Sequence, residues 1–91
     1  ITVLPADIFG GAPAAATHIG LRPEQILQGD GEDSTVHRVE HLGDQTRLHL
    51  SFKSHDLITV TDAHTDLKVG DIVKIRPYEA LYFGANGARV A

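Results

Sequence analysis

The chain of 91 residues contains no cysteine, no methionine and no tryptophan. Without cysteine it has no disulfide bond, no thiolate nucleophile and no zinc site built on thiolates. Because it opens on Ile1 and holds no methionine, we interpret it as a fragment of a longer protein. No apolar stretch approaches the roughly 20 residues that span a bilayer, and no segment resembles a signal peptide. We therefore expect a soluble piece.

Positive charge is also scarce, since 8 lysines and arginines stand against 12 aspartates and glutamates, for a formal net charge of −4. Proteins that bind nucleic acid neutralise phosphates with a basic stripe, and this sequence has none. The aromatic residues are few: Phe9, Phe52, Tyr78, Tyr82 and Phe83. We expect these rings to serve core packing and an interface contact, and we expect no nucleic-acid partner.

Motifs for catalysis and nucleotide binding are missing as well. No serine lies in a nucleophile-elbow sequence. Ser54, His55 and Asp56 are adjacent in sequence but do not form a catalytic triad, because neighbours in a strand point to opposite faces. No glycine precedes a lysine, so the phosphate-binding loop Gly-x-x-x-x-Gly-Lys is absent. We expect this chain to be no enzyme and to hold no cofactor.

Six histidines raise the question of a metal site. His37 and His41 lie four residues apart on an expected strand, which separates them by roughly 13 Å at about 3.3 Å per residue. Zinc needs its ligand nitrogens about 2 Å from one centre. In the hairpin register described below, His49 points to the face opposite these two. We therefore expect no metal site.

Short apolar and β-branched runs alternate with turn residues along the chain, which predicts one small all-β domain, a barrel or sandwich. The expected strands are residues 1–4, 17–21, 35–42, 45–53, 56–61, 72–76 and 81–83. One helical turn is expected at residues 24–27. Residues 10–16 are expected to form a flexible connection, and residues 29–33 a solvated acidic loop.

The clearest element is a hairpin whose strands are joined by Gly43-Asp44, where glycine in the first position predicts a type II′ turn. One face then carries Val39, Thr46, Leu48, Leu50 and Phe52. The other carries Arg38, Glu40, Arg47 and His49. This alternation predicts one buried and one polar face. Glu40 and Arg47 would form a cross-strand ion pair worth about 0.2–1 kcal/mol.

Three blocks follow one another in a fixed order: Ile19-Gly20-Leu21-Arg22-Pro23-Glu24, Val39-Glu40-His41-Leu42-Gly43-Asp44-Gln45-Thr46 and Leu67-Lys68-Val69-Gly70-Asp71. The first two together are specific, whereas the third is common in small barrels. In this order they resemble the transport-associated OB (TOBE) domain at the C-terminus of ATP-binding subunits of bacterial sugar-uptake ABC transporters, of the maltose and glycerol-phosphate type. The resemblance implies that residues 1–91 form one all-β, OB-like barrel of short antiparallel strands with one or two short helical turns.

The resemblance also implies a function, that of a non-catalytic regulatory and dimerisation domain. ATP and magnesium would bind an upstream ATPase domain that this chain does not contain. The implied partners are a second copy of the chain, that ATPase domain and, through it, the membrane subunits of the transporter, at the cytoplasmic face of the inner membrane. An open edge on the first strand would be available to the second copy. The candidate interface residues are Arg22, Glu24, Arg38, Glu40, Arg47 and His49.

Two other functions stay open from the sequence. A free-standing barrel would sense a small ligand, an oxyanion or a metabolite, between two copies. An unrelated OB-like or SH3-like module would bind nucleic acid, against which the charge count argues. Arg22 and Glu24 also have a local interpretation, in which they only fix the turn around Pro23 through hydrogen bonds.

Overall fold

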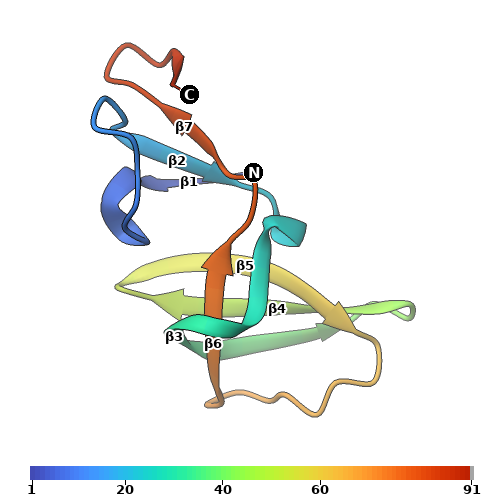
Figure 1. Cartoon of the computed structure of the whole chain (residues 1–91). Coiled ribbons are helices and arrows are strands. Elements are labelled where there is room, and N and C mark those ends of the chain that lie inside the picture. Colours follow the sequence, from blue (N-terminus) through green and yellow to red (C-terminus); the bar gives the residue numbers. More distant parts are fainter. Residues whose placement is uncertain (91) are drawn as a thin grey trace.

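The computed structural model describes residues 1–90, and within that range eight strands and two short 3₁₀ turns make the chain all-β, as predicted (Figure 1). The elements are β1 (Thr2–Pro5), η1 (Ala6–Ile8), β2 (His18–Leu21), η2 (Pro23–Gln25), β3 (Ile26–His41), β4 (Gln45–Phe52), β5 (His55–Asp62), β6 (Ile72–Pro77), β7 (Leu81–Phe83) and β8 (Arg89–Val90). The strands form two antiparallel sheets, with the orders β1-β2-β7-β8 and β5-β4-β3-β6. This architecture agrees with the expected small OB-like fold.

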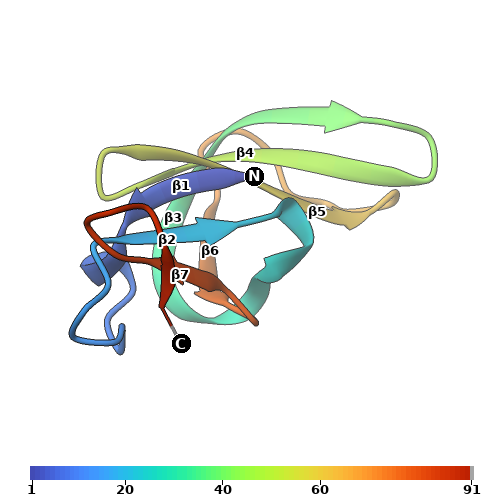
Figure 2. The same cartoon turned by 90° about the horizontal axis from the view of Figure 1, so that it is seen from above.

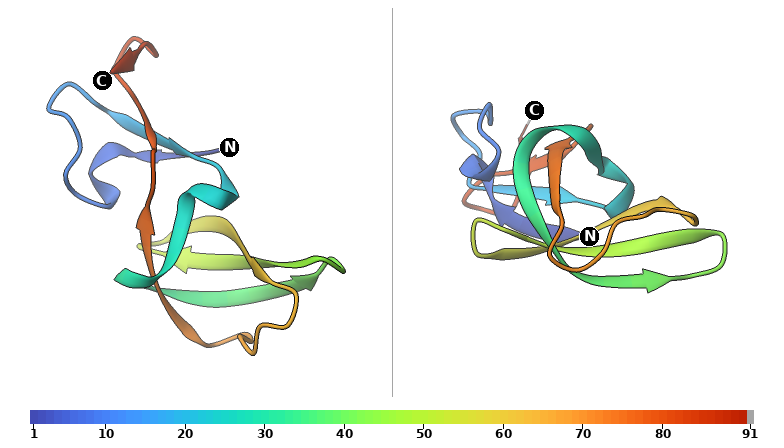
Figure 3. Two further views of the ribbon diagram at one scale, coloured as in Figure 1. Left: turned by 45° about the vertical axis from the view of Figure 1, so that its right-hand side comes forward. Right: turned by 90° about the horizontal axis from the view of Figure 1, so that it is seen from below.

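The second sheet depends on one long strand, β3, where the prediction of a solvated loop at residues 29–33 is wrong. Residues 26–28 of β3 pair with residues 75–77 of β6, and residues 32–35 pair with residues 72–75. Between them Gly29 and Gly31 have φ of 114° and 109°, a backbone conformation that favours glycine. They let the chain turn sharply, so that β3 pairs with β6 on both sides of the turn before residues 35–41 pair with β4 (Figure 3).

Ion pairs with β6 and with the β4–β5 turn explain why so acidic a segment can belong to a sheet. The pairs are Asp30 with Arg76 at 2.8 Å, Glu32 with Lys53 at 2.9 Å and Asp33 with Lys74 at 2.9 Å. The helical turn predicted at residues 24–27 is also displaced, because η2 begins with Pro23 and Ile26 already belongs to β3. Proline suits the first position of a helical turn, and Ile26 is buried opposite Pro77.

One hydrophobic core lies between the two sheets. Its buried members come from both sheets and from η1: Leu4, Ile8, Ile19, Leu21, Ile26, Val36, Leu48, Leu50, Phe52, Leu57, Val73 and Ile75. The apolar face predicted for the hairpin supplies its centre, with Val39 partly buried and Phe9 stacked on Phe52 at 4.9 Å. Burial of this face fixes the hairpin register, since a slip of one residue would turn every apolar side chain to solvent.

The β3–β4 hairpin has the predicted pairing of Glu40 with Arg47. Gly43 has φ of 88° at its turn, and the backbone N–H of Leu42 donates to the carbonyl of Gln45 at 2.9 Å, as the predicted two-residue turn requires. The tip of this hairpin extends well beyond the first sheet (Figure 2). The outer surface of β3 and β4 is therefore presented away from most of the molecule.

Candidate functional site

The six residues predicted for an interface fall into two groups. Four lie on the outer surface of β3 and β4 and are named the hairpin face: Arg38, Glu40, Arg47 and His49. Arg22 and Glu24 instead flank Pro23 at η2 and line a hollow on another part of the surface. Within residues 1–90, no hydrogen bond or ion pair joins the two groups. The structure therefore separates two candidate sites.

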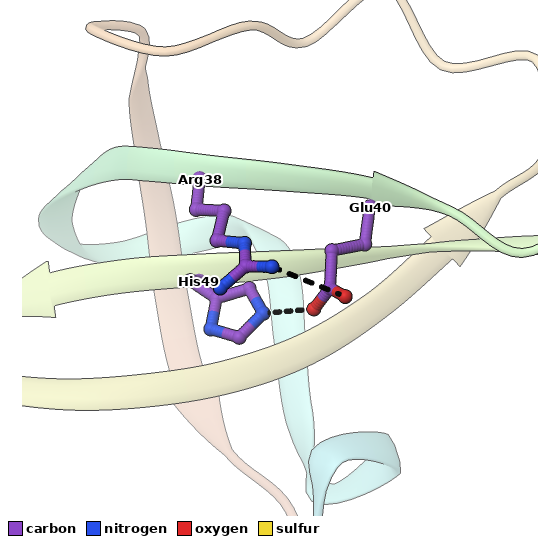
Figure 4. Close-up of polar contacts among 3 residues, drawn as sticks. All are labelled: Arg38, Glu40 and His49. Atoms are coloured by element: carbon purple, nitrogen blue, oxygen red, sulfur yellow. Dashed lines mark hydrogen bonds and ion pairs between the residues drawn. The ribbon is translucent and has the colours of Figure 1, made fainter.

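Glu40 is the centre of the hairpin face (Figure 4). A carboxylate only accepts hydrogen bonds, so Nε2–H of His49 donates to Oε1 of Glu40. Nη2 of Arg38 lies 3.7 Å from Oε2 of the same carboxylate. The side chains of Glu40 and His49 are 27% and 19% exposed, whereas that of Arg38 is 65% exposed. Solvent therefore screens the contact of Glu40 with Arg38 more than the contact of Glu40 with His49.

The charge of Glu40 follows from these contacts. The hydrogen bond from His49 lowers the pKa of the Glu40 carboxyl, and partial burial opposes this change. The positive charges of Arg38 and Arg47 act in the same direction as the hydrogen bond. The pKa lies below its ordinary value, so the side chain is a carboxylate at neutral pH.

The ion pair predicted between Glu40 and Arg47 is absent from the contacts within residues 1–90. The two residues lie opposite each other in the register, as predicted. The carboxylate turns instead to His49, its diagonal neighbour, and to Arg38 on its own strand. Long side chains reach diagonal neighbours as easily as opposite ones, so the register alone did not decide the partner.

A β-bulge corrects the predicted position of His37. Val36 pairs with Leu50 and Arg38 pairs with His49, which leaves His37 as an extra residue in β3. The prediction that His37 and His49 face opposite sides is therefore wrong, because their ring centroids lie 6.0 Å apart on the outer surface.

The sequence does contain a signal for this bulge. Val36 and Val39 are three residues apart, so a regular strand would turn one of them outward. Both contribute to the core, because the bulge turns the two residues between them, His37 and Arg38, toward solvent. Two apolar residues at odd spacing, with two polar residues between them, indicate such an insertion.

His37 and His49 each contact a carboxylate. Nε2 of His37 lies 3.5 Å from Oδ1 of Asp56, while His49 is bonded to Glu40. Across the described residues, no group of three or more histidine, aspartate or glutamate side chains is placed to hold a metal ion. No helix among those residues is long and apolar enough to cross a membrane.

The second candidate site is a hollow of about 420 Å³ between η2 and the β6–β7 connection, named the η2 hollow. Its lining residues are Arg22, Glu24, Gln25, Tyr78, Glu79 and Leu81. Gln25 joins its two walls. The side-chain amide of Gln25 accepts a hydrogen bond from the backbone N–H of Arg22 at 2.9 Å and donates one to the backbone carbonyl of Glu79 at 2.8 Å. The backbone carbonyl of Gln25 accepts a hydrogen bond from the backbone N–H of Tyr78 at 2.8 Å.

These contacts revise the local interpretation of Arg22 and Glu24. The backbone of Arg22 makes the hydrogen bonds that close the turn, with Gln25 as its partner. The charged ends of Arg22 and Glu24 make no hydrogen bond or ion pair within residues 1–90. The side chains that the turn does not use are therefore available to a ligand or partner.

A family model of the TOBE domain matches residues 19–82, more than two thirds of the chain. The chain belongs to the TOBE domain family. The match extends from β2 to β7 and includes both the hairpin face and the η2 hollow. No curated protein matches the chain.

Membership indicates that this TOBE domain is non-catalytic and has a regulatory or ligand-binding role in ABC transporters. Sequence reasoning missed four residues of the η2 hollow, namely Gln25, Tyr78, Glu79 and Leu81. A glutamine three residues after the start of a turn is a known capping pattern, so Gln25 had a readable signal. Tyr78 and Glu79 had none, because only the folded chain brings them more than fifty residues back to η2.

Proposed function

We propose that this TOBE domain is the regulatory and dimerisation domain of the ATP-binding subunit of a bacterial ABC importer for sugars or related solutes. The observation that carries the proposal is the TOBE match over residues 19–82. ATP and magnesium would bind an ATPase domain of the same subunit, because this chain has no phosphate-binding loop. Its place would be the cytoplasmic face of the inner membrane, next to the membrane subunits of the transporter.

Such a domain would act as a tether. A lasting contact between the TOBE domains of two subunits would keep the two ATPase domains at high effective concentration while their nucleotide sites open and close. A regulator that binds one arrangement better than the other would then shift the equilibrium between them.

The hairpin face has the composition of a contact surface. In the register of β4 with β5, Ile58 lies beside His49 and Val60 beside Arg47, so half-buried apolar side chains share the outer surface with charged ones. These apolar side chains lie on the edge strand β5, beside the charged ones, and interfaces bury apolar and polar surface together. Charges of both signs on one patch also allow it to pair with itself across a twofold axis.

Sedimentation equilibrium of the chain tests the contact. The double charge reversal Arg38→Glu with Arg47→Glu should weaken self-association by about tenfold or more, because it places four like charges at the twofold contact. The matched control Lys68→Glu with Arg89→Glu makes the same change of net charge away from the hairpin face, at exposed positions, and should behave as the unmodified chain. A chain that is monomeric at millimolar concentration, or equal effects of the two double variants, would contradict the hairpin face as the contact.

The parent protein is tested separately by sequencing the coding DNA upstream of Ile1. An in-frame phosphate-binding loop and ABC signature would support the ATP-binding subunit. A start codon directly before Ile1 would instead support the sensor barrel, a second candidate that we retain because the surface has a hollow lined by unpaired charges. Calorimetric titration with molybdate, sulfate and sugar phosphates would then identify the class of ligand.

A further inference from the structure

We infer that the η2 hollow binds a small zwitterion, a molecule with an ammonium and a carboxylate group beside an apolar or aromatic side chain, which is the chemistry of a free α-amino acid. The hollow lies apart from the hairpin face, so this inference does not depend on the proposed dimer contact. Its volume of about 420 Å³ falls in the range of about 300–1,000 Å³ that is usual for small-molecule sites.

The first argument is the charge pattern of the lining. The hollow holds one cation, Arg22, and two anions, Glu24 and Glu79. Within residues 1–90 none of the three forms an ion pair, with one another or with any other side chain. By contrast, Asp30, Glu32 and Asp33 on neighbouring β3 are all paired. Unpaired charges of both signs in one hollow match a ligand that carries both signs.

The second argument is the apolar part of the lining. Tyr78 is 49% exposed although it is a large aromatic side chain, and Leu81 lies beside it on the same wall. An aromatic face attracts a cation and also packs against an apolar side chain. The ring of Tyr78 is therefore suited to both the ammonium group and the side chain of the ligand.

The third argument is that the backbone holds these groups in place before any ligand arrives. The hydrogen bonds of Gln25 join the wall that carries Arg22 to the wall that carries Tyr78 and Glu79. Glu79 has φ of 51°, a left-handed conformation that is uncommon outside glycine. Fixed walls reduce the ordering cost of binding.

Other ligand classes fit the hollow less well. A simple anion would meet two carboxylates, and a simple cation would leave Arg22 unpaired. A neutral sugar would form hydrogen bonds with the polar groups but would neutralise none of the three charges. Another hollow formed by the described residues, about 370 Å³ and lined by Val3, His18, Phe83, Gly84, Ala85 and Gly87, carries no arginine or carboxylate side chain and serves as an internal comparison.

Titration followed by amide NMR shifts tests the inference with a matched series of probes. L-phenylalanine carries both charges, 2-phenylethylamine lacks the carboxylate, 3-phenylpropionate lacks the ammonium, and glucose lacks both. We expect saturable shifts at residues 22–25 and 78–81 with L-phenylalanine, and affinity weaker by about tenfold or more for each of the other three, because each charged group lost removes a charge-assisted hydrogen bond. Tighter binding of glucose or of either single-charge probe, shifts centred on the Phe83 hollow, or no saturation would overturn the assignment.

Two variants separate the roles of the charges. Arg22→Gln should reduce the affinity for L-phenylalanine to that of the amine and leave the amine unchanged. The turn should survive, because its hydrogen bonds use the backbone of Arg22 and the side chain of Gln25. The control Arg38→Gln, on the hairpin face, should change neither affinity. Equal effects of the two substitutions would refute a specific role for Arg22, and Glu79→Gln, which should weaken both L-phenylalanine and the amine, gives an independent check.

Discussion

Gly31 lies where the backbone of β6 passes closest to β3. Both Gln28 and Glu32 pair with Ile75, so residues 29–31 form an excursion over that residue. A Cβ built on Gly31 would lie 2.0 Å from the carbonyl oxygen of Ile75 and 2.7 Å from its carbonyl carbon. Real Cβ atoms do not come this close to other atoms, so something would have to shift. The atoms in the way are backbone atoms in the middle of the β3–β6 ladder, so the sheet itself would have to move.

Gly29 is a matched control for this position. Its φ of 114° is close to the 109° of Gly31, but nothing lies within 4 Å of its virtual Cβ. Gly29→Ala therefore introduces backbone strain alone. The unfolded alanine chain has less conformational entropy than the glycine chain, which offsets part of this strain, so we expect the free energy of unfolding to fall by about 1 kcal/mol. Gly31→Ala adds overpacking of about 1–3 kcal/mol and lost ladder hydrogen bonds, for a total of about 3–5 kcal/mol.

Thermal unfolding followed by circular dichroism measures both changes. For a domain of this size about 1 kcal/mol shifts Tm by roughly 4–8 °C, so Gly29→Ala should lower Tm by about that amount and Gly31→Ala by about 15 °C or more. A Gly31→Ala chain that does not fold while Gly29→Ala does agrees with the reasoning. Equal losses of Tm for the two variants would refute it, because φ would then account for the whole effect.

Two further predictions concern stability. Lys53 and Ser54 form the β4–β5 turn with φ of 47° and 68°, so Ser54→Gly should raise the free energy of unfolding by about 0.5 kcal/mol by relieving left-handed strain. The control Ser51→Gly, within β4, should lower the free energy of unfolding. A urea titration in which both variants lower the free energy of unfolding would contradict the turn assignment. The pKa of Glu40 is lowered in the folded state from its ordinary 4.5, so Glu40 adds stability above that pH and loses it as the pH falls through the lowered pKa. At pH 7 the urea midpoint of Glu40→Gln should thus lie below that of the unmodified chain, and the two midpoints should converge as the pH falls through the lowered pKa of Glu40. The difference at pH 7 should shrink when His49→Ala is present in both chains. A difference that does not depend on pH would contradict the linkage.

The hairpin was predictable because its information is local. Alternating apolar and polar residues from Val39 to Phe52, with Gly43-Asp44 between the strands, allow one register with a buried face, and the structure has that register. The contact partners on the polar face were not predictable in the same way. Glu40 has a neighbour opposite, a diagonal neighbour and a neighbour on its own strand, and small differences in side-chain geometry choose among them.

The acidic segment at residues 29–33 shows where sequence reasoning failed. Glycines between acidic residues have the composition of a solvated loop. The cations that neutralise the segment, Lys53, Lys74 and Arg76, lie 20 or more residues away in the sequence. Only the pairing of β6 with both halves of β3 brings two of them alongside, and that pairing is a long-range property of the sheet.

By itself the sequence determined the all-β class, the hairpin register, the absence of nucleotide-binding motifs and, through three ordered blocks, the TOBE family. These are properties of local alternation, turn residues and motif order, which are written along the chain. The tertiary structure alone decided the sharp bend of β3 and the meeting of Arg22 with Tyr78 and Glu79 in one hollow. The reason is physical: each depends on which distant strands pair and on where the shared core leaves room, and no short stretch of sequence contains that information.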